Sequence, residues 1–369
     1  MNLSQKLDSL TAPGELYETL DKHALRCLAC GHRCLIREGK RGICQVRFND
    51  GGELRVPFGY VAALQADPIE KKPFYHFLAG ENALSFGMLG CDLHCGYCQN
   101  WFTSQALRDP ASDGAGRLVR EISPTGLVAL AKQTDSKIIA STYNEPLITS
   151  EWAVAVFKEA RQAGLKTAFV SNGHATPEAL NYLAPYLDAY KIDLKSMQAK
   201  NYRDLGGTLN HVLDSIKLAK ELGLWLEVVT LVVPGFNDSN AELWEAARFM
   251  ASVSPDIPWH VTAYHQDYKM TENENTPLET LVRAAELGRE AGLRYVYAGN
   301  VHGRAGEYES TFCPSCQRAL IKRVGFSLRE YLLTDDGNCP YCETEIAGVW
   351  TEQTGGITLN GWGVPRLIR

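Results

Sequence analysis

Residues 90–100 read Gly90-Cys91-Asp92-Leu93-His94-Cys95-Gly96-Tyr97-Cys98-Gln99-Asn100, which spaces three cysteines as C-x3-C-x2-C. The apolar run just before them, residues 83–89, predicts a buried parallel strand. Three thiolates on one short loop can hold three irons of a cubic [4Fe–4S] cluster. No fourth cysteine follows nearby in the sequence, so the fourth iron stays open to a substrate or cofactor. The motif therefore predicts a catalytic cluster rather than a structural zinc knuckle or unrelated core thiols.

A C-x3-C-x2-C loop directly after a strand resembles the signature of the radical S-adenosylmethionine (radical SAM) superfamily. The resemblance implies that Cys91, Cys95 and Cys98 are the catalytic cluster ligands and that the open iron binds the amino and carboxylate groups of SAM. It further implies that reductive cleavage of SAM releases a 5′-deoxyadenosyl radical, which takes hydrogen from a substrate. Tyr97, the aromatic residue before the third cysteine, is expected beside the cofactor.

The composition fits a metalloprotein of a reducing compartment. The chain has 369 residues and a formal net charge of −6, which gives no general attraction to nucleic acid or to an anionic membrane. Residues 1–6 lack the apolar core of a signal peptide, and the longest apolar stretch, residues 228–233, is too short to span a bilayer. The 11 cysteines fall into three tight groups, which favours metal binding over disulfides. We therefore expect a cytoplasmic protein with no membrane partner, and nucleic acid binding is not favoured.

Strand and helix patterns alternate between residues 81 and 305 and predict six or seven βα units. The fold class is thus α/β, and the length of each unit fits a (β/α)-barrel, so the partial (β/α)6 TIM-like barrel of radical SAM enzymes is expected. A doubly wound open sheet is the structural alternative. In either fold the functional residues lie at the carboxyl ends of the strands. Residues 1–80 should form an N-terminal cysteine-rich module, and residues 306–369 a C-terminal domain.

Glu145 follows the second strand of the predicted barrel, in the run Thr142-Tyr143-Asn144-Glu145-Pro146. Radical SAM enzymes commonly carry Gly-Gly-Glu here, and the resemblance implies that Glu145 holds the amino group of SAM. The chain departs from that pattern at Tyr143 and Asn144, and Asn144 is a candidate cofactor contact. The alternative is a polar turn before Pro146.

Polar residues also end the third and fourth strands. Asn172 is suited to contact SAM or to form an Asx turn. Alternation puts Asp193 and Lys195 on one face of the fourth strand, directed into the barrel, where opposite charges must pair with each other or with a ligand. The run resembles glycyl-radical activating enzymes, in which an Asp-x-Lys pair lies near SAM and substrate. A structural ion pair is the alternative.

The last strands supply three weaker candidates. His265 resembles a position near the adenine and ribose in activating enzymes, although a lone histidine is more often a surface or core residue. Asn300 and His302 end the last strand and are expected to face the substrate.

Two paired C-x2-C motifs lie near the C-terminus, Cys313–Cys316 and Cys339–Cys342, with strand-like segments between them. This spacing predicts a zinc ribbon, whose four thiolates leave no open position on the metal and therefore serve structure. Redox dithiols or a rubredoxin-like iron are the alternatives.

Four cysteines also lie near the N-terminus, in the pattern C-x2-C-x3-C-x9-C formed by Cys27, Cys30, Cys34 and Cys44. Their clustering predicts a second metal site, and the basic residues around them would offset the charge of several thiolates. Zinc and an auxiliary iron–sulfur cluster both fit, and His32 is able to replace one sulfur.

The order of these motifs resembles one family over nearly the whole chain. The sequence carries the cysteine-rich N-terminus, then residues 67–73 (Asp-Pro-Ile-Glu-Lys-Lys-Pro), the cysteine loop with Gln99-Asn100-Trp101, residues 142–146, and Thr311-Phe312-Cys313-Pro314-Ser315-Cys316. It is similar to the radical SAM member of the AmmeMemoRadiSam system, a relative of pyruvate formate-lyase activating enzymes. The resemblance implies Memo-like and AMMECR-like partner proteins and a reductant such as a flavodoxin or ferredoxin.

The sequence thus predicts a radical SAM enzyme that acts on an unidentified substrate. A glycyl-radical-enzyme activase acting on a protein partner is the first alternative. A non-catalytic iron–sulfur and zinc protein, which passes electrons or assembles complexes, is the second.

Overall fold

Nine strands form the central sheet of the computed structural model, which describes residues 2–301, 303–361 and 366–368. Their order across the sheet is β16-β15-β14-β13-β12-β11-β9-β8-β20. From one edge to the other the strands are β16 (Val296–Gly299), β15 (Trp259–Ala263), β14 (Trp225–Val232), β13 (Ala189–Asp193), β12 (Lys166–Ser171), β11 (Ser136–Ser141), β9 (Asn82–Gly87), β8 (Ala63–Pro68) and β20 (Arg366–Leu367).

The strands from β9 to β16 are parallel and follow one another in chain order, whereas β8 and β20 are antiparallel additions beside β9. A doubly wound sheet reverses its strand order at a switch point, and this part of the sheet shows no reversal. All residues of β9 after Asn82 are buried, as expected for a parallel strand covered on both faces. The prediction of consecutive parallel βα units is therefore confirmed.

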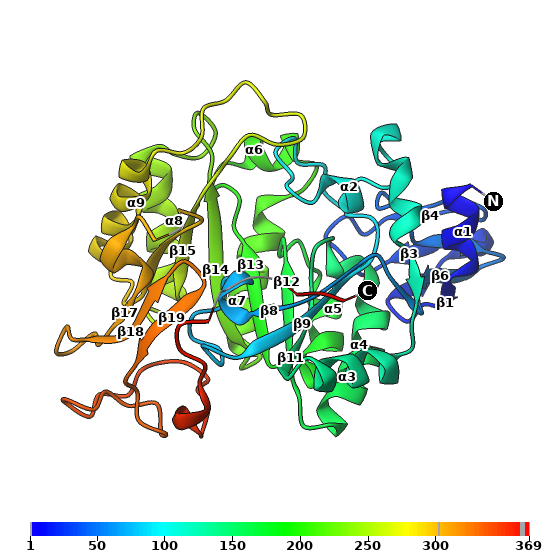
Figure 1. The fold of residues 1–369 in the computed structure, drawn as a ribbon. Coiled ribbons are helices and arrows are strands. Elements are labelled where there is room, and N and C mark those ends of the chain that lie inside the picture. The colour runs from blue at the N-terminus through cyan, green and yellow to red at the C-terminus, as the bar shows by residue number, and fades with distance from the viewer. Residues whose placement is uncertain (1, 302, 362–365, 369) are drawn as a thin grey trace.

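Helices follow the parallel strands and pack against the sheet, as Figure 1 shows. They are α3 (Pro124–Gln133), α4 (Ser150–Gln162), α5 (Pro177–Leu183), α7 (Leu209–Glu221), α8 (Asn240–Val253) and α9 (Leu278–Glu290). Three of them begin with a hydroxyl cap, in which the side chains of Ser123, Thr176 and Ser239 accept a hydrogen bond from the first helical turn. The shorter helices are α1 (Leu3–Ser9), α2 (Trp101–Ser104) and α6 (Ala199–Asp204).

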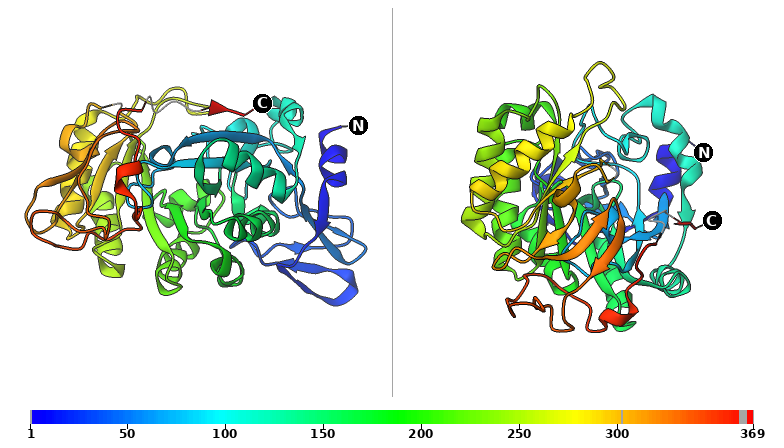
Figure 2. Two further views of the ribbon diagram at one scale, coloured as in Figure 1. Left: turned by 60° about the horizontal axis from the view of Figure 1, so that its bottom comes forward. Right: turned by 60° about the vertical axis from the view of Figure 1, so that its left-hand side comes forward.

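Small antiparallel sheets lie at opposite ends of the molecule (Figures 1 and 2). The N-terminal end holds two three-stranded sheets, β1-β6-β5 and β2-β3-β4, and the C-terminal end holds β17-β18-β19. Their bounds are β1 (Thr11–Pro13), β2 (Tyr17–Thr19), β3 (Leu25–Cys27), β4 (Leu35–Ile36), β5 (Phe48–Asp50), β6 (Glu53–Pro57), β17 (Thr311–Phe312), β18 (Ala319–Val324) and β19 (Ser327–Tyr331). The pair β7 (Tyr60–Val61) and β10 (Arg120–Glu121) completes the strands.

The C-terminal strands are bound to the segment between β8 and β9 by Arg323 of β18, which is buried. Its guanidinium donates to the Tyr75 carbonyl at 2.8 Å and to Thr311 Oγ1 at 2.8 Å, and lies 3.9 Å from the Glu70 carboxylate. Burial raises the pKa of Glu70 to about 7 in spite of that cation. The C-terminal sheet therefore holds residues 70–75 in place.

No helix in the described part of the chain is long and apolar enough to cross a membrane. The boundaries expected for three domains, at residues 80 and 305, remain predictions.

Candidate active site at the cysteine loop

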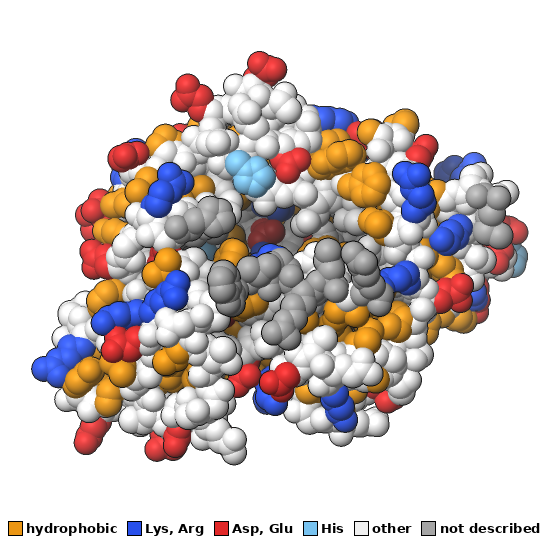
Figure 3. Space-filling view, in the orientation of Figure 1, with side chains coloured by type: hydrophobic (Ala, Val, Ile, Leu, Met, Phe, Trp, Pro, Cys, Tyr) orange, Lys and Arg blue, Asp and Glu red, His pale blue; other side chains and the backbone are white. Residues whose placement is uncertain are grey.

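A cavity of about 490 Å³ lies beside the cysteine loop, and its walls come from the lead-in to β9 and from strands across the sheet. Figure 3 shows a hollow near the centre of one face, with acidic and basic side chains inside it. Ten candidates from the sequence line this cavity, namely Cys91, Cys95, Tyr97, Cys98, Asn144, Glu145, Asn172, Asp193, Lys195 and Asn300.

The cysteine loop leaves the carboxyl end of β9 and is fastened by Arg108. The guanidinium donates to the carbonyls of Cys91 at 2.5 Å and Leu93 at 2.7 Å. The Leu93 N–H donates to Cys91 Sγ at 3.4 Å, and Ser104 Oγ lies 3.2 Å from Cys98 Sγ. Hydrogen bonds of this kind tune a metal-bound sulfur.

The thiols of this loop suit a cluster better than a single ion. A tetrahedral zinc with 2.3 Å bonds needs sulfurs about 3.8 Å apart. Among the described residues, Cys91, Cys95 and Cys98 do not form a group whose ligand atoms all lie within 4.8 Å of one another. Burial raises the pKa of Cys95 to about 11, with Lys195 opposing it, so the thiolates need the positive charge of bound metal.

Glu145 is buried and accepts three hydrogen bonds. Its Oε1 accepts from the Leu147 N–H at 3.0 Å and from Ser171 Oγ at 2.7 Å, and its Oε2 accepts from the Asn172 N–H at 2.7 Å. Burial, followed by the charge of Asp92, raises its pKa to about 8 against these donors. The carboxylate lines the cavity and also caps the turn after it, which is the polar turn considered from the sequence.

Tyr143 takes a backbone conformation that favours glycine, with φ at 71°. Its hydroxyl lies 3.0 Å from Lys72 Nζ and donates toward Gln65 Oε1 at 3.2 Å. The neighbouring Asn144 Oδ1 accepts from the Met88 N–H at 2.9 Å. The chain thus keeps a glycine-like turn at this point although its residues depart from Gly-Gly-Glu.

Asn172 forms the Asx turn considered from the sequence, because its Oδ1 accepts from the His174 N–H at 2.8 Å. Its Nδ2 donates to Asp92 Oδ1 at 2.7 Å, and His174 Nδ1 lies 3.0 Å from Asp92 Oδ2. Cys30, Asp92 and His174 form a compact buried group of possible metal ligands. Hydrogen bonds already engage both carboxylate oxygens, and the second ring nitrogen faces the Thr208 N–H at 3.2 Å. The group therefore brings Cys30 of the N-terminal cysteines within 4.8 Å of Asp92, the residue after Cys91 in the cysteine loop.

Asp193 and Lys195 lie side by side as alternation predicts, with Lys195 Nζ 3.4 Å from Asp193 Oδ2. Lys191, which the sequence reasoning overlooked, shares this face and also pairs with Asp193. The two lysines outweigh burial and hold the pKa of Asp193 below its usual range.

His265 and Asn300 lie at the rim. His265 is exposed and lies outside the cavity lining, with its Nε2 2.9 Å from Gln99 Nε2 of the cysteine loop. Asn300 lines the cavity, and its Nδ2 donates to the Ala263 carbonyl at 2.7 Å. His302 lies outside the described residues.

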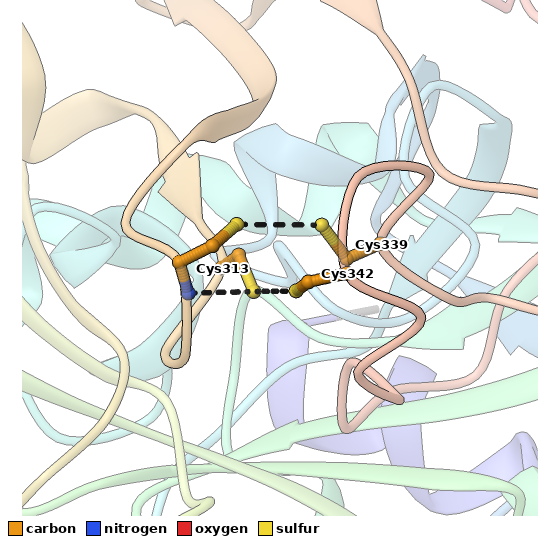
Figure 4. Close-up of side chains that lie close together, drawn as sticks. Cys313, Cys339 and Cys342 are labelled. Atoms are coloured by element: carbon orange, nitrogen blue, oxygen red, sulfur yellow. Dashed lines mark hydrogen bonds between the residues drawn. The ribbon is translucent and has the colours of Figure 1, made fainter.

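The four C-terminal cysteines gather into one group whose ligand atoms all lie within 4.8 Å of one another. Cys313 Sγ is 3.6 Å from Cys342 Sγ, and Cys316 Sγ is 3.7 Å from Cys339 Sγ (Figure 4). These separations match the spacing of about 3.8 Å around one tetrahedral ion. A hydrogen bond from Thr344 lowers the pKa of Cys342, which favours the thiolate. The cysteine group can therefore hold a metal ion.

The N-terminal cysteines are arranged differently. Within the described residues, no three of Cys27, Cys30, Cys34 and Cys44 form such a compact group. Burial raises the pKa values of Cys30, Cys34 and Cys44, the last to about 11.

Several functional candidates escaped the sequence reasoning. Besides Lys191, the cavity is lined by Glu70, Lys71, Lys72 and His260. Inward alternation in β13 was a signal for Lys191, whereas the others are brought to the cavity by contacts between distant segments.

Comparisons with known proteins agree with this geometry. The sequence model of the radical SAM superfamily matches residues 87–250 of this chain. An uncharacterised protein of Methanocaldococcus jannaschii is 37% identical over 333 residues, which cover 89% of this chain and 97% of that protein. The isethionate sulfite-lyase activating enzyme of Desulfovibrio desulfuricans is 29% identical over 125 residues, which cover 33% of this chain and 40% of that enzyme.

Among solved structures, a radical SAM methyltransferase from Sphaerobacter thermophilus has a TM-score of 0.46 and 13% identity, and the match covers 79% of this chain and 78% of that one. The superfamily match includes the C-x3-C-x2-C loop and the strands that surround the cavity. The chain therefore belongs to the radical SAM superfamily, as an enzyme related to the activating enzymes.

Proposed function

We propose that Cys91, Cys95 and Cys98 hold a [4Fe–4S] cluster next to SAM in the cavity. The observation that carries the proposal is the convergence of these thiols and Glu145 on one cavity at the carboxyl ends of β9 and β11. A reduced cluster of this kind supplies the electron that cleaves SAM to a 5′-deoxyadenosyl radical, which then takes hydrogen from a substrate.

The surrounding residues bind and orient the cofactor in this proposal. Glu145 binds the amino group of SAM, and Asn144 and Asn172 keep the turns around it in place through their hydrogen bonds. Asp193 and Lys195 form the charged wall near the thiols. The Tyr97 ring packs edge-on against Phe236, with 5.8 Å between the ring centroids, and closes the cavity beside the loop. His265 lies at the rim of the cavity, and its contact with Gln99 holds it beside the cofactor.

The proposal is tested by anaerobic reconstitution followed by addition of SAM and dithionite. The wild-type protein should form 5′-deoxyadenosine, and Cys95→Ala should form none. Ser315→Ala serves as the control, because it changes an exposed side chain outside the cavity lining and leaves every cysteine in place. An intact wild-type cluster that yields no product and no SAM-dependent change in its EPR spectrum would contradict the proposal.

An activase is the second candidate, because several relatives are named as activating enzymes, for isethionate sulfite-lyase and for 4-hydroxyphenylacetate decarboxylase. The matches cover 40% and 37% of those enzymes, so the substrate of this chain is not inferred from them. An EPR doublet from a glycyl radical on a partner protein, formed only with SAM and reductant, would establish this activity.

Finer assignments belong to the same proposal. The strand order supports a partial (β/α)6 barrel, and the sulfur spacing at Cys313, Cys316, Cys339 and Cys342 supports a structural zinc ribbon. The wider spread of the N-terminal cysteines favours an auxiliary iron–sulfur cluster over zinc. The motif order supports membership of the AmmeMemoRadiSam system, with Memo-like and AMMECR-like partners, a flavodoxin or ferredoxin as reductant, and a cytoplasmic location.

A further inference from the structure

Two buried lysines, Lys72 and Lys191, line the cavity that also holds the cysteine thiols. We call this pair the lysine floor. Lys191 lies within β13, whereas Lys195 follows the carboxyl end of that strand at Asp193. Lys195 acts on the pKa of Cys95 and Cys98, whereas Lys191 acts on the pKa of Lys72. Lys191 of the lysine floor therefore lies farther from the carboxyl end of β13 than Lys195, which acts on the cluster ligands.

Lys72 shares its counterion with another lysine. Its Nζ donates to Asp67 Oδ2 at 2.8 Å and contacts the Tyr143 hydroxyl at 3.0 Å, while Lys71 Nζ approaches Asp67 Oδ1 at 3.3 Å. Lys72 also lies over the Tyr143 ring, 4.5 Å from its centroid. Because an ammonium group has three N–H donors, these contacts leave one donor of Lys72 free among the described residues.

Lys191 shares its counterion in the same way. Asp193 pairs with both Lys191 and Lys195, and it is the hydrogen-bond acceptor for Lys191 among the described residues. Two donors of this buried ammonium group therefore remain free. Burial, assisted by the charge of Lys191, lowers the pKa of Lys72 to about 8.

The charges around the lysine floor do not balance. Four lysines share two aspartates, since Lys71 and Lys72 meet Asp67 and Lys191 and Lys195 meet Asp193. The other nearby carboxylates are engaged elsewhere. Glu70 faces Arg323, and Glu145 accepts its three hydrogen bonds. Glu227, opposite Lys191 on β14, lies 2.6 Å from His260 Nε2 and accepts from the N–H groups of Tyr75 and His76. Buried cations with free donors are costly unless an anion completes their coordination.

We propose that the lysine floor binds the carboxylate or phosphate of a small anionic substrate and thereby directs the rest of that substrate toward the cysteine loop. The inference rests on the proposed function, because it concerns the substrate that the SAM-derived radical attacks. Lys72 belongs to residues 67–73, a segment with no role in cluster or SAM binding, and this segment would here help to bind the anionic substrate.

The test uses the anaerobically reconstituted holoenzyme with SAM bound. Calorimetry at constant ionic strength measures the binding of two probes, inorganic phosphate and succinate, to distinguish the two sources of negative charge. We expect at least one probe to bind, and Lys72→Met and Lys191→Met each to weaken that binding at least tenfold. Lys191→Arg should retain more affinity than Lys191→Met, and Lys166→Met, which changes a half-exposed lysine outside the cavity lining, should match the wild type.

A measurement without variants accompanies the calorimetry. In crystals of the wild-type holoenzyme soaked with selenate, the anomalous peak should lie between Lys72 Nζ and Lys191 Nζ. The proposal is overturned if neither probe binds, if the lysine variants bind as tightly as Lys166→Met, or if selenate lies elsewhere. Formation of 5′-deoxyadenosine by the wild type is measured separately, so its failure identifies a fault in the proposed function rather than in the lysine floor.

Discussion

The carboxylate of Asp92 lies 3.0 Å from the imidazole of His174, and both side chains are almost completely buried. Asp92 directly follows the first cysteine of the loop after β9, and His174 follows β12, so the pair joins segments that leave two strands separated in the sheet by β11. Burial would raise the pKa of Asp92, but hydrogen bonds from His174 and Asn172 outweigh it and keep the pKa below its usual range.

Replacement of Asp92 by asparagine should destabilise the fold by roughly 2 kcal/mol, because the buried amide keeps only one acceptor oxygen and leaves either His174 Nδ1 or Asn172 Nδ2 without one. Urea unfolding of the metal-free protein measures this loss. Glu178→Gln is the matched control, since the Arg33–Glu178 pair is partly exposed and should contribute less than about 1 kcal/mol. Equal losses of unfolding free energy in the two variants would show that the buried Asp92–His174 pair stabilises the fold no more than the partly exposed pair does.

Glu145 should make the metal-free protein less stable as the pH rises. Its pKa is raised to about 8 in the folded state, so its stabilising contribution is complete below the unfolded value of about 4.3 and is lost as the pH rises through about 8. Glu145→Gln should flatten this part of the stability curve. The measurement is thermal unfolding between pH 5 and 9, and parallel curves for both proteins would refute the prediction.

Tyr143 provides a test of backbone strain. Tyr143→Ala loses the contacts of the hydroxyl and ring with Lys72 and keeps the unfavourable positive φ. Tyr143→Gly loses the same contacts but relieves the strain, so it should be more stable than Tyr143→Ala by about 1 kcal/mol. Denaturant unfolding of the two variants measures this difference in stability. A more stable alanine variant would mean that the turn changes its backbone conformation and so loses the strain.

The C-terminal cysteines should hold about one zinc ion per chain, and Cys313→Ser should lose it with loss of local structure. Metal analysis and proteolysis of residues 306–369 measure both effects. The control is Ser315→Ala, an exposed position in the same turn. Retention of a full zinc ion by Cys313→Ser would exclude the four-thiolate site.

The N-terminal cysteines should bind iron rather than zinc. The reconstituted wild type should then carry about eight irons per chain and Cys44→Ser about four, as expected for two cubic clusters. If elemental analysis finds zinc in place of the second set of irons, the N-terminal cysteines bind zinc, the other metal that their spacing allows.

Local patterns were sufficient to predict the parallel core. The parallel strands are short, largely apolar runs, and three of the helices between them begin with a hydroxyl cap, as at Ser239 before α8, so the signal is contained in adjacent residues. The N-terminal strands were not predicted in detail, because several contain only two or three residues and their pairing depends on distant partners, as between β1 and β6.

The residues of the candidate site also fall into two groups, those with a local sequence signal and those brought to the cavity by distant contacts. The cysteines, Glu145 and the Asp193–Lys195 pair could be found because each lies just after a strand or within its alternation. Lys72 could not, since it reaches the cavity through Asp67 and Tyr143, and the contact with Tyr143 spans 71 residues of sequence. Pairs such as Glu227 and His260, 2.6 Å apart on adjacent strands, likewise depend on a register that the sequence alone does not give.

Arg323 has a physiological consequence. Because this residue of β18 fastens the backbone of Tyr75 and faces Glu70, both of which line the cavity, the C-terminal sheet and the cavity share one set of buried contacts. If the C-terminal cysteines hold a metal, a cell starved of that metal should therefore lose the activity of this radical SAM enzyme even when its iron supply is ample. A shortage of the C-terminal metal in the growth medium would then look like a shortage of iron, because the activity that depends on the iron–sulfur cluster would be lost.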